Sequence, residues 1–291
     1  MQTNFEQTCS AYVQAVEAYL DTCFAWQNLP QQKLFDAMRY SLLAGGKRLR
    51  PLYVLEFCRL CGGNWHDALP FAAAIEMVHT YSLIHDDLPC MDNDDYRRGK
   101  PTSHKVFGEA NAVLAGDALL TEAFVTLTAA QLPSERIVQA VRILSTAAGA
   151  LGMVGGQVLD LEAEHKVCTA DEVYAIESRK TGALIAAACQ LGVAAAGGSA
   201  VQLRAAERYA NGIGLAFQIR DDMLDVIGSR EKLGKATGMD AKKNTFVIHY
   251  GLDACERMVT EETDKALQAL EVFDDTAFVT ALSRSLIARD H

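Results

Sequence analysis

Hydrophobic side chains recur at intervals of three and four residues along most of the chain, which is the spacing of helices that bury one face. Between Phe5 and Cys23 these positions include Tyr12, Val16 and Leu20. Similar patterns predict helices over residues 31–44, 51–61, 71–86, 110–130, 134–150, 152–161, 170–179, 182–196, 214–225 and 252–288. No stretch alternates convincingly as a β-strand would, so the pattern predicts an all-α protein.

Glycine and proline mark where the predicted helices end. Gly45-Gly46 is expected to stop the second helix, and Gly228-Ser229-Arg230 is expected to stop the helix over 214–225. All six prolines lie within the first 133 residues, so the remainder is expected to form helices with short connections. No linker or change of composition divides the chain, and we expect a single domain over residues 1–291.

The composition is that of a soluble globular protein, with 50% hydrophobic residues, 22% charged residues and a formal net charge of -10. No long basic run is present, which argues against nucleic acid as a partner. The most apolar later stretch, residues 183–198, is short and interrupted by Gln190, so we expect a buried helix and no membrane span. Eight scattered cysteines and an N-terminus unlike a signal peptide predict reduced thiols in the cytoplasm.

One stretch is unusually acidic. It follows an apolar helix, precedes Arg97-Arg98, and holds five aspartates within ten residues: Asp86, Asp87, Asp92, Asp94 and Asp95. Such a run is often a solvated surface, but it is also suited to a divalent metal ion. Asp94 and Asp95 are expected to face solvent.

Pro89 decides whether two of these aspartates can act together. In a regular helix, Asp92 would be turned about 120° away from Asp86. Proline removes a backbone N–H and disfavours helical geometry in the residue before it. A bulge at Pro89 would bring Asp92 back towards Asp86.

A second acidic cluster favours the metal interpretation. Asp221 and Asp225 are four residues apart, and Gln218 lies three before Asp221, so the three share one helix face. Carboxylates suit Mg²⁺, which fills its remaining positions with water and phosphate oxygens. Separate basic elements suit phosphate: Lys47 with Arg50, Arg97 with Arg98, Lys180, and Lys235. The sequence therefore predicts an Mg²⁺–diphosphate site.

These motifs resemble those of the trans-isoprenyl diphosphate synthases over residues 30–245, and more narrowly the bacterial farnesyl type, whose first aspartate motif carries the insertion seen at Pro89-Cys90. The motifs are Gly45-Gly46-Lys47-Arg48-Leu49-Arg50-Pro51, Asp86 to Asp92 with Arg97-Arg98-Gly99, Gly156-Gln157 with Asp160-Leu161, Lys180-Thr181-Gly182, and Phe217-Gln218 with Asp221 to Asp225. The resemblance implies a single-domain helical bundle around a deep central cavity. It also implies Mg²⁺-dependent condensation of dimethylallyl or geranyl diphosphate with isopentenyl diphosphate, giving farnesyl diphosphate (C15) and pyrophosphate, and a homodimer.

The resemblance also implies a role for each site residue. Three Mg²⁺ ions would be held by Asp86, Asp92, Asp221 and Asp225, with Asp87 supporting the first cluster. The allylic diphosphate would contact Arg97, Lys180, Gln218 and Lys235, and Phe217 would line the substrate site. Isopentenyl diphosphate would contact Lys47, Arg50, His79 and Arg98. Thr181 would face the developing carbocation.

Tyr81 and Ser82 are expected to set the length of the product. Tyr81 lies five residues before Asp86, about 7.5 Å of helix rise, where a large side chain would stop the growing tail. In the resembling family an aromatic residue at that place goes with a C15 product. In the resembling family a smaller residue at that place tends to give C20, so a geranylgeranyl diphosphate synthase is the alternative.

Two further functions stay open. A non-catalytic subunit of a heteromeric synthase would be expected to lack one of the clusters, and a class I terpene cyclase would carry a different second metal motif. Arg48 alone is interpreted as a solvated neighbour of Lys47 and Arg50, and Lys242-Lys243 as a surface pair or a phosphate contact. Asn244-Thr245-Phe246-Val247 lacks the proline that the family often has there.

Overall fold

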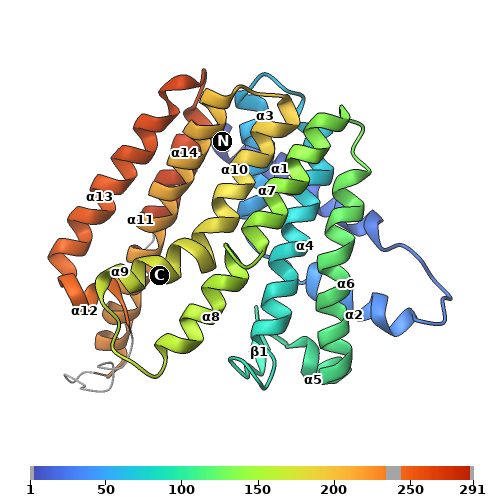
Figure 1. Ribbon diagram of the computed structural model, residues 1–291, viewed down its shortest axis with the longest axis horizontal. Helices are drawn as coiled ribbons and strands as arrows, with labels where there is room; N and C mark the ends of the chain where they lie inside the picture. The colour runs from blue at the N-terminus through green and yellow to red at the C-terminus, as the bar shows by residue number, and fades with distance from the viewer. Residues whose placement is uncertain (1–2, 234–243, 289–291) are drawn as a thin grey trace. The chain divides into compact units, whose positions relative to one another are not determined.

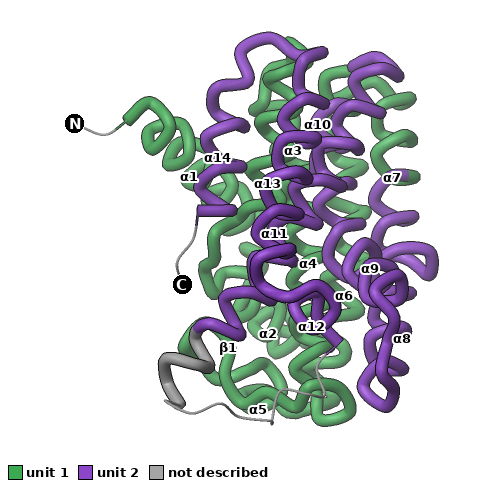
Figure 2. Tube along the Cα trace, turned by 90° about the vertical axis from the view of Figure 1, so that its left-hand side faces the viewer, with its two compact units in different colours: residues 1–142, 194–197 green, residues 143–193, 198–291 purple. Residues whose placement is uncertain are grey.

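The structure is a computed structural model that describes residues 3–233 and 244–288. Lys235, Lys242 and Lys243, for which the sequence suggested phosphate roles, lie outside these residues. The chain forms two compact units, residues 1–142 with 194–197 and residues 143–193 with 198–291 (Figure 2). The expectation of one domain over 1–291 stays a prediction.

The first unit is built around one apolar helix. Its helices are α1 (Asn4–Cys23), α2 (Gln32–Leu42), α3 (Leu49–Leu60), α4 (Leu69–Asp86), α5 (Ser103–Phe107), α6 (Glu109–Thr128) and the start of α7 (Ser134–Ala148), with a 3₁₀ turn η1 (Trp65–Ala68). Almost every side chain from Phe71 to Val78 is buried, as expected of a helix that is hydrophobic on all sides. α4 packs along α6 (Figure 1).

Gly116 of α6 makes room for the side chain of His85 near the end of α4. A Cβ atom at this position would lie 2.1 Å from Nε2 of His85. The missing side chain therefore makes room for the imidazole, whose Nε2 lies 3.1 Å from the Val113 carbonyl oxygen. This contact holds the last turn of α4, which carries Asp86, against α6.

The second unit is dominated by the long helix α11 (Ala200–Leu233), which packs along α13 (Leu252–Ala269) (Figure 1). Its other elements are α8 (Met153–Ala163), α9 (Ala170–Glu177), a π-helical turn η2 (Ser178–Gly182), α10 (Ala183–Ala196), α12 (Phe246–Tyr250), the 3₁₀ turn η3 (Leu270–Val272) and α14 (Ala277–Ile287). Ala216, Ile219 and Met223 place a buried stripe of α11 in a core shared with Phe246 and Val259.

The all-α class is confirmed, but several details are corrected. The helix expected over 214–225 begins at Ala200, and the stretch 252–288 is divided into α13 and α14. The expected stop at Gly228-Ser229-Arg230 is wrong, because α11 continues to Leu233; an interior glycine costs about 1 kcal/mol, which packing along a helix can outweigh. A short antiparallel hairpin is also present, with β1 (Tyr96–Arg97) paired to β2 (Lys100–Pro101). Strands of two residues are too short to show an alternating hydrophobic pattern in the sequence.

Two helical segments of the described chain, Glu109–Thr128 and Ser134–Ala163, are long and apolar enough to meet a length-and-composition criterion for crossing a membrane. Apolar core helices of soluble proteins meet the same criterion. The expectation of no membrane span stays a prediction.

Candidate active site

The first acidic loop folds back at Pro89, as the sequence predicted. α4 ends at Asp86, and the backbone N–H of Asp92 donates to the Asp86 carbonyl oxygen at 2.8 Å. The Asn93 N–H donates to the Leu88 carbonyl oxygen at 3.1 Å, which closes the loop. Asp92 is exposed and Asp86 is partly exposed. The backbones of Asp86 and Asp92 therefore meet at the C-terminal end of α4.

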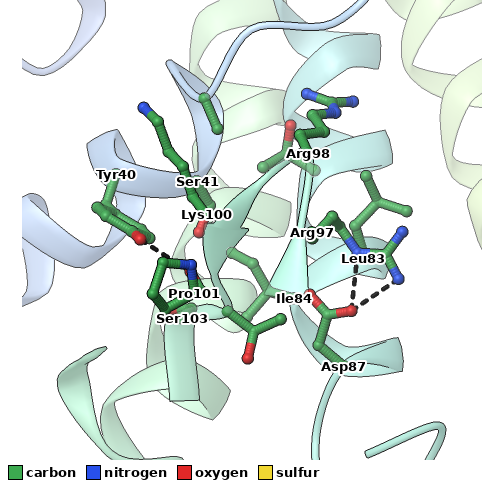
Figure 3. Close-up of a pocket in the computed structure, with 13 residues that line it drawn as sticks. Tyr40, Ser41, Leu83, Ile84, Asp87, Arg97, Arg98, Lys100, Pro101 and Ser103 are labelled. Atoms are coloured by element: carbon green, nitrogen blue, oxygen red, sulfur yellow. Dashed lines mark hydrogen bonds and ion pairs between the residues drawn. The ribbon is translucent and has the colours of Figure 1, made fainter. Parts of the chain in front are cut away.

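Asp87 has a different environment from its neighbours. Its side chain is buried, and its Oδ1 accepts hydrogen bonds from both Nε and Nη2 of Arg97 at 2.7 Å (Figure 3). Burial raises the pKa of Asp87, while the Arg97 guanidinium acts in the opposite direction. Asp94 lies farther from Arg97, at 3.6 Å. Asp87 therefore positions Arg97, while its predicted support of the first metal cluster stays a prediction.

The hairpin sends two neighbouring arginines to different partners. Arg98 and Gly99 form the turn, and both have left-handed backbones, with φ of 53° and 74°. Nη1 of Arg98 donates to the Gly45 carbonyl oxygen. A Cβ atom on Gly46 would lie 2.8 Å from the Arg98 guanidinium, and the φ of 129° at Gly46 also favours glycine. The Gly45-Gly46 loop and the hairpin are thus joined through Arg98.

A cationic cluster surrounds His79. Its pKa is lowered well below the usual range, first by burial and then by the charges of Arg50 and Arg98. Arg50 lies in the first turn of α3, and its buried Nε has no hydrogen-bond partner among the described residues. Lys47 is exposed in the loop before it. A buried guanidinium nitrogen without an acceptor is suited to an anionic ligand.

A pocket lies beside the hairpin. Its lining includes Tyr40, Asp87, Arg97, Lys100 and Ser103 (Figure 3). The Tyr40 hydroxyl donates to the Pro101 carbonyl oxygen at 2.8 Å, which ties α2 to β2. The pocket thus adjoins the ion pair of Asp87 and Arg97.

Tyr81 is buried one turn before His85 on α4, with the two ring centroids 5.7 Å apart. Burial, aided by the charge of Asp86, raises the pKa of Tyr81 to about 12. The hydroxyl of Ser82 donates to the His79 carbonyl oxygen at 2.9 Å. Tyr81 therefore lies near Asp86, and its role in limiting the product stays a prediction.

In the second unit, the motif of Gly156 and Asp160 contacts the motif of Lys180 and Thr181. Lys180 and Thr181 lie in the π-helical turn η2, a form that is frequent at functional sites. A Cβ atom on Gly156 of α8 would lie 2.3 Å from the Lys180 backbone nitrogen, so glycine permits this contact. Nζ of Lys180 lies 2.5 Å from Oδ2 of Asp160.

The second acidic cluster lies on α11. Gln218, Asp221 and Asp222 are partly buried, and Asp225 is exposed. Oδ2 of Asp222 accepts a hydrogen bond from the Phe246 N–H at 2.8 Å. Burial, together with Asp225 and Asp221, raises the pKa of Asp222 to about 6. Phe217 precedes this cluster and is partly buried.

Glu177 is a site residue that the sequence reasoning missed. Burial first, and then the charges of Asp222 and Asp160, raise its pKa to about 7. The Thr181 hydroxyl lies 3.4 Å from Oε2 of Glu177. The spacing of four residues between Glu177 and Thr181 would have placed them on one helix face.

Glu177 is expected to make the metal-free protein less stable as the pH rises. Its pKa is about 7 when folded against 4.5 for the ordinary side chain, so between these values the folded state holds a proton that the unfolded state has lost. The cost is absent below about pH 4.5, complete above about pH 7, and on the order of 3 kcal/mol at most. Glu177→Gln should therefore stabilise the protein at pH 8 and not at pH 4.5, as measured by urea unfolding with chelator present.

Glu172 on the same helix is the matched control. Its pKa is lowered to about 2, chiefly by the hydrogen bond from Lys166, so Glu172→Gln should instead lose stability at pH 8. Equal behaviour of the two variants across this pH range would contradict the assignment for Glu177.

The donor set fits Mg²⁺ within each acidic cluster. The described residues contain no group of three or more histidine, cysteine, aspartate or glutamate side chains close enough to hold an ion by themselves. Mg²⁺ is usually bound by one or two carboxylates, with water and substrate phosphate oxygens completing its shell. The exposed Asp92 and the partly exposed Asp86 offer such a pair in the first unit. Asp221 and Asp225 offer another in the second.

Three comparisons place the chain among known proteins. The polyprenyl synthetase family profile matches residues 31–281. A farnesyl diphosphate synthase of Micrococcus luteus is 49% identical over 250 residues, covering 84% of this chain and 86% of the relative. A chloroplastic geranylgeranyl pyrophosphate synthase of Capsicum annuum is 46% identical, covering 89% and 72%. The apo structure of an FPP/GFPP synthase from Zymomonas mobilis matches with a TM-score of 0.89 at 36% identity, covering 98% and 99%.

Proposed function

This chain belongs to the polyprenyl synthetase family, and we propose that it condenses dimethylallyl or geranyl diphosphate with isopentenyl diphosphate to give farnesyl diphosphate and pyrophosphate. It is a transferase of prenyl groups. The observation that carries this assignment to the site is the cationic cluster of Arg50 and Arg98 around the buried His79. Arg98 belongs to the same hairpin as Arg97, which pairs with the first acidic loop through Asp87. The proposed site for an anionic substrate would thus adjoin the proposed metal ligands Asp86 and Asp92 within one compact unit.

Polyprenyl synthetases generally depend on Mg²⁺, and we propose three ions for this chain. Asp86 and Asp92 would hold two of them, and Asp221, aided by Asp225, would hold the third. When bound, the metal neutralises the departing pyrophosphate as its negative charge develops. The fold-back at Pro89 supports this role, because the hydrogen bond from the Asp92 N–H to the Asp86 carbonyl oxygen keeps the two residues close together.

Two groups of polar and cationic side chains would divide the substrates between them. Arg97, Lys180, Gln218 and Lys235 would bind the allylic diphosphate, with Phe217 lining its site, while Lys47, Arg50, His79 and Arg98 would bind isopentenyl diphosphate. Arginine binds phosphate through two parallel hydrogen bonds, and lysine acts as a point charge. Arg97 is held in position by Asp87, and Lys180 by Asp160, so both cations are preorganised.

The carbon–carbon bond forms after the allylic diphosphate ionises. The double bond of isopentenyl diphosphate attacks the allylic cation, and a proton then leaves, with the released pyrophosphate as its acceptor. The Thr181 hydroxyl, held near Glu177, and the backbone around it would face the cation. Apolar surroundings keep water from quenching it.

The test is direct. Purified protein is incubated with labelled isopentenyl diphosphate, Mg²⁺ and each allylic primer, and the product chain length is measured. We expect a C15 product. A C20 product would favour a geranylgeranyl diphosphate synthase. Absence of condensation with every primer would refute the enzyme assignment and favour a non-catalytic subunit.

Tyr81→Ala is expected to lengthen the product from C15 to C20 or longer. The buried phenol lies near Asp86, and its removal opens space on the order of the ring's volume where the growing tail would end. Product chain length, measured with geranyl and farnesyl diphosphate as primers, gives the readout. Tyr40→Phe is the control, since it removes only a hydroxyl bonded to Pro101. An unchanged C15 product from Tyr81→Ala would remove Tyr81 from this role.

We further propose a cytoplasmic homodimer. α6 exposes the apolar side chains of Val113, Leu114 and Val125, which a second copy of the chain would cover. All eight cysteines lie within the described residues and are free thiols, which suits a reducing compartment. A monomeric mass in solution by light scattering would contradict the dimer.

A further inference from the structure

Arg48 was expected to be solvated, and this expectation is wrong. Its side chain is fully buried, and the guanidinium donates three hydrogen bonds. The acceptors are Oε1 of Glu17 at 2.6 Å, Oε1 of Glu76 at 2.7 Å and the Leu42 carbonyl oxygen at 2.8 Å. One side chain thus joins α1, α4 and the end of α2.

The backbone of Arg48 is in the left-handed region, with φ of 48° and ψ of 35°. For a residue with a Cβ atom this conformation costs about 1 kcal/mol or more, and it persists where surrounding contacts fix it. Arg48 is the N-cap of α3, so its conformation sets the direction in which the chain leaves Lys47 and enters the turn that carries Arg50. The three hydrogen bonds of its guanidinium are the contacts that hold this conformation.

Glu76 links this anchor to the cationic cluster. It is buried on α4, one turn before His79. Its negative charge favours the charged forms of Arg50 and Arg98 and so opposes the mutual repulsion of these arginines. Of the two glutamates that accept hydrogen bonds from Arg48, Glu17 on α1 is the more exposed, with 36% of its side chain accessible against 3% for Glu76.

We propose that Glu17, Arg48 and Glu76 form a positioning triad for isopentenyl diphosphate, which fixes the loop between Lys47 and Arg50 and balances the charge beside it. This inference rests on the proposed function. It assigns α1 a part in substrate binding, although α1 carries none of the residues predicted to touch substrate. Its effect is confined to one substrate, since no member of the triad contacts Arg97 or Asp87 in the described structure.

The test compares Michaelis constants for the two substrates. Glu17→Ala removes one acceptor at a half-exposed position, and Arg48→Gln removes the anchor. Each is expected to raise the KM for isopentenyl diphosphate about tenfold and to leave the KM for geranyl diphosphate within about twofold. Arg48→Lys keeps the charge without the planar fork, so it should recover part of the loss.

Glu56→Gln provides the control for a merely structural effect. Glu56 is also a fully buried carboxylate, but it is bonded to Tyr12 of α1 and paired with Arg59 of its own helix, away from Arg48. Glu56→Gln should lower the melting temperature and leave both Michaelis constants unchanged.

The outcomes separate this inference from the function on which it rests. If the wild-type protein condenses the substrates while Glu17→Ala leaves both constants unchanged, or raises the two equally, the triad has no positioning role and the proposed function stands. If the wild-type protein does not condense them, the proposed function fails and this inference fails with it. Should Arg48→Gln not fold, Glu17→Ala still decides.

Discussion

Asp86→Asn is expected to lower kcat by about 10³-fold, because the amide cannot replace the charge with which a carboxylate binds Mg²⁺. The backbone bond from Asp92 to Asp86 should survive, since it does not involve the side chain. The variant is therefore expected to keep its melting temperature and to need a higher Mg²⁺ concentration for half-maximal rate. Steady-state kinetics across a Mg²⁺ titration measures both effects.

Asp95→Asn in the same loop is the matched control. Asp95 is exposed and pairs with Lys105 at 2.6 Å, away from Asp86 and Asp92. An exposed pair of this kind contributes little, so activity should stay within about twofold. A kcat for Asp86→Asn equal to that of the control would overturn the metal role of the loop.

Gly156→Ala is expected to lower kcat by about 10²-fold and the free energy of unfolding by about 1–3 kcal/mol. The added methyl group would lie 2.3 Å from the backbone nitrogen of Lys180 and 2.7 Å from its Cα. Because these are backbone atoms, they cannot rotate away, and α8 must separate from the π-helical turn. The ion pair of Asp160 and Lys180 would be displaced with it.

Gly214→Ala tests whether any added methyl group in this unit has the same effect. Its nearest neighbours would be Cδ1 of Ile185 at 3.7 Å and Cα of Gly182 at 3.8 Å, which are ordinary contacts. Alanine also favours a helix interior, so Gly214→Ala should be neutral or stabilising. Full activity and unchanged unfolding in Gly156→Ala would show that α8 and the turn do not need this close contact.

Local rules in the sequence predicted much of the fold and the first acidic loop. Hydrophobic spacing located most of the helices, because each buries a face of its own. The bounds were wrong for α11, which begins at Ala200, and for the stretch 252–288, which is divided into α13 and α14. The return of Asp92 towards Asp86 followed from the chemistry of Pro89 alone, and the structure confirms it. Such features depend on neighbours a few residues apart.

Features that depend on distant partners could not be predicted in the same way. Arg48 appeared solvated because its neighbours in sequence are cations, whereas its partners Glu17 and Glu76 lie 31 and 28 residues away. The sequence did not indicate Glu177, since its raised pKa comes from burial and from the charges of Asp222 on another helix and of Asp160. The packing of Gly156 against Lys180 joins two motifs that the sequence shows only as separate glycine and lysine signals.

The hairpin between Tyr96 and Pro101 limits how this region can change during evolution. Arg97 reaches Asp87 and Arg98 reaches the Gly45 carbonyl group from adjacent positions, and the turn between the strands is only two residues long. Gaining or losing one residue there would shift the pairing register and direct each arginine to the wrong partner. Evolutionary drift within the hairpin is therefore confined to substitutions, so its length should persist even where its amino acids differ.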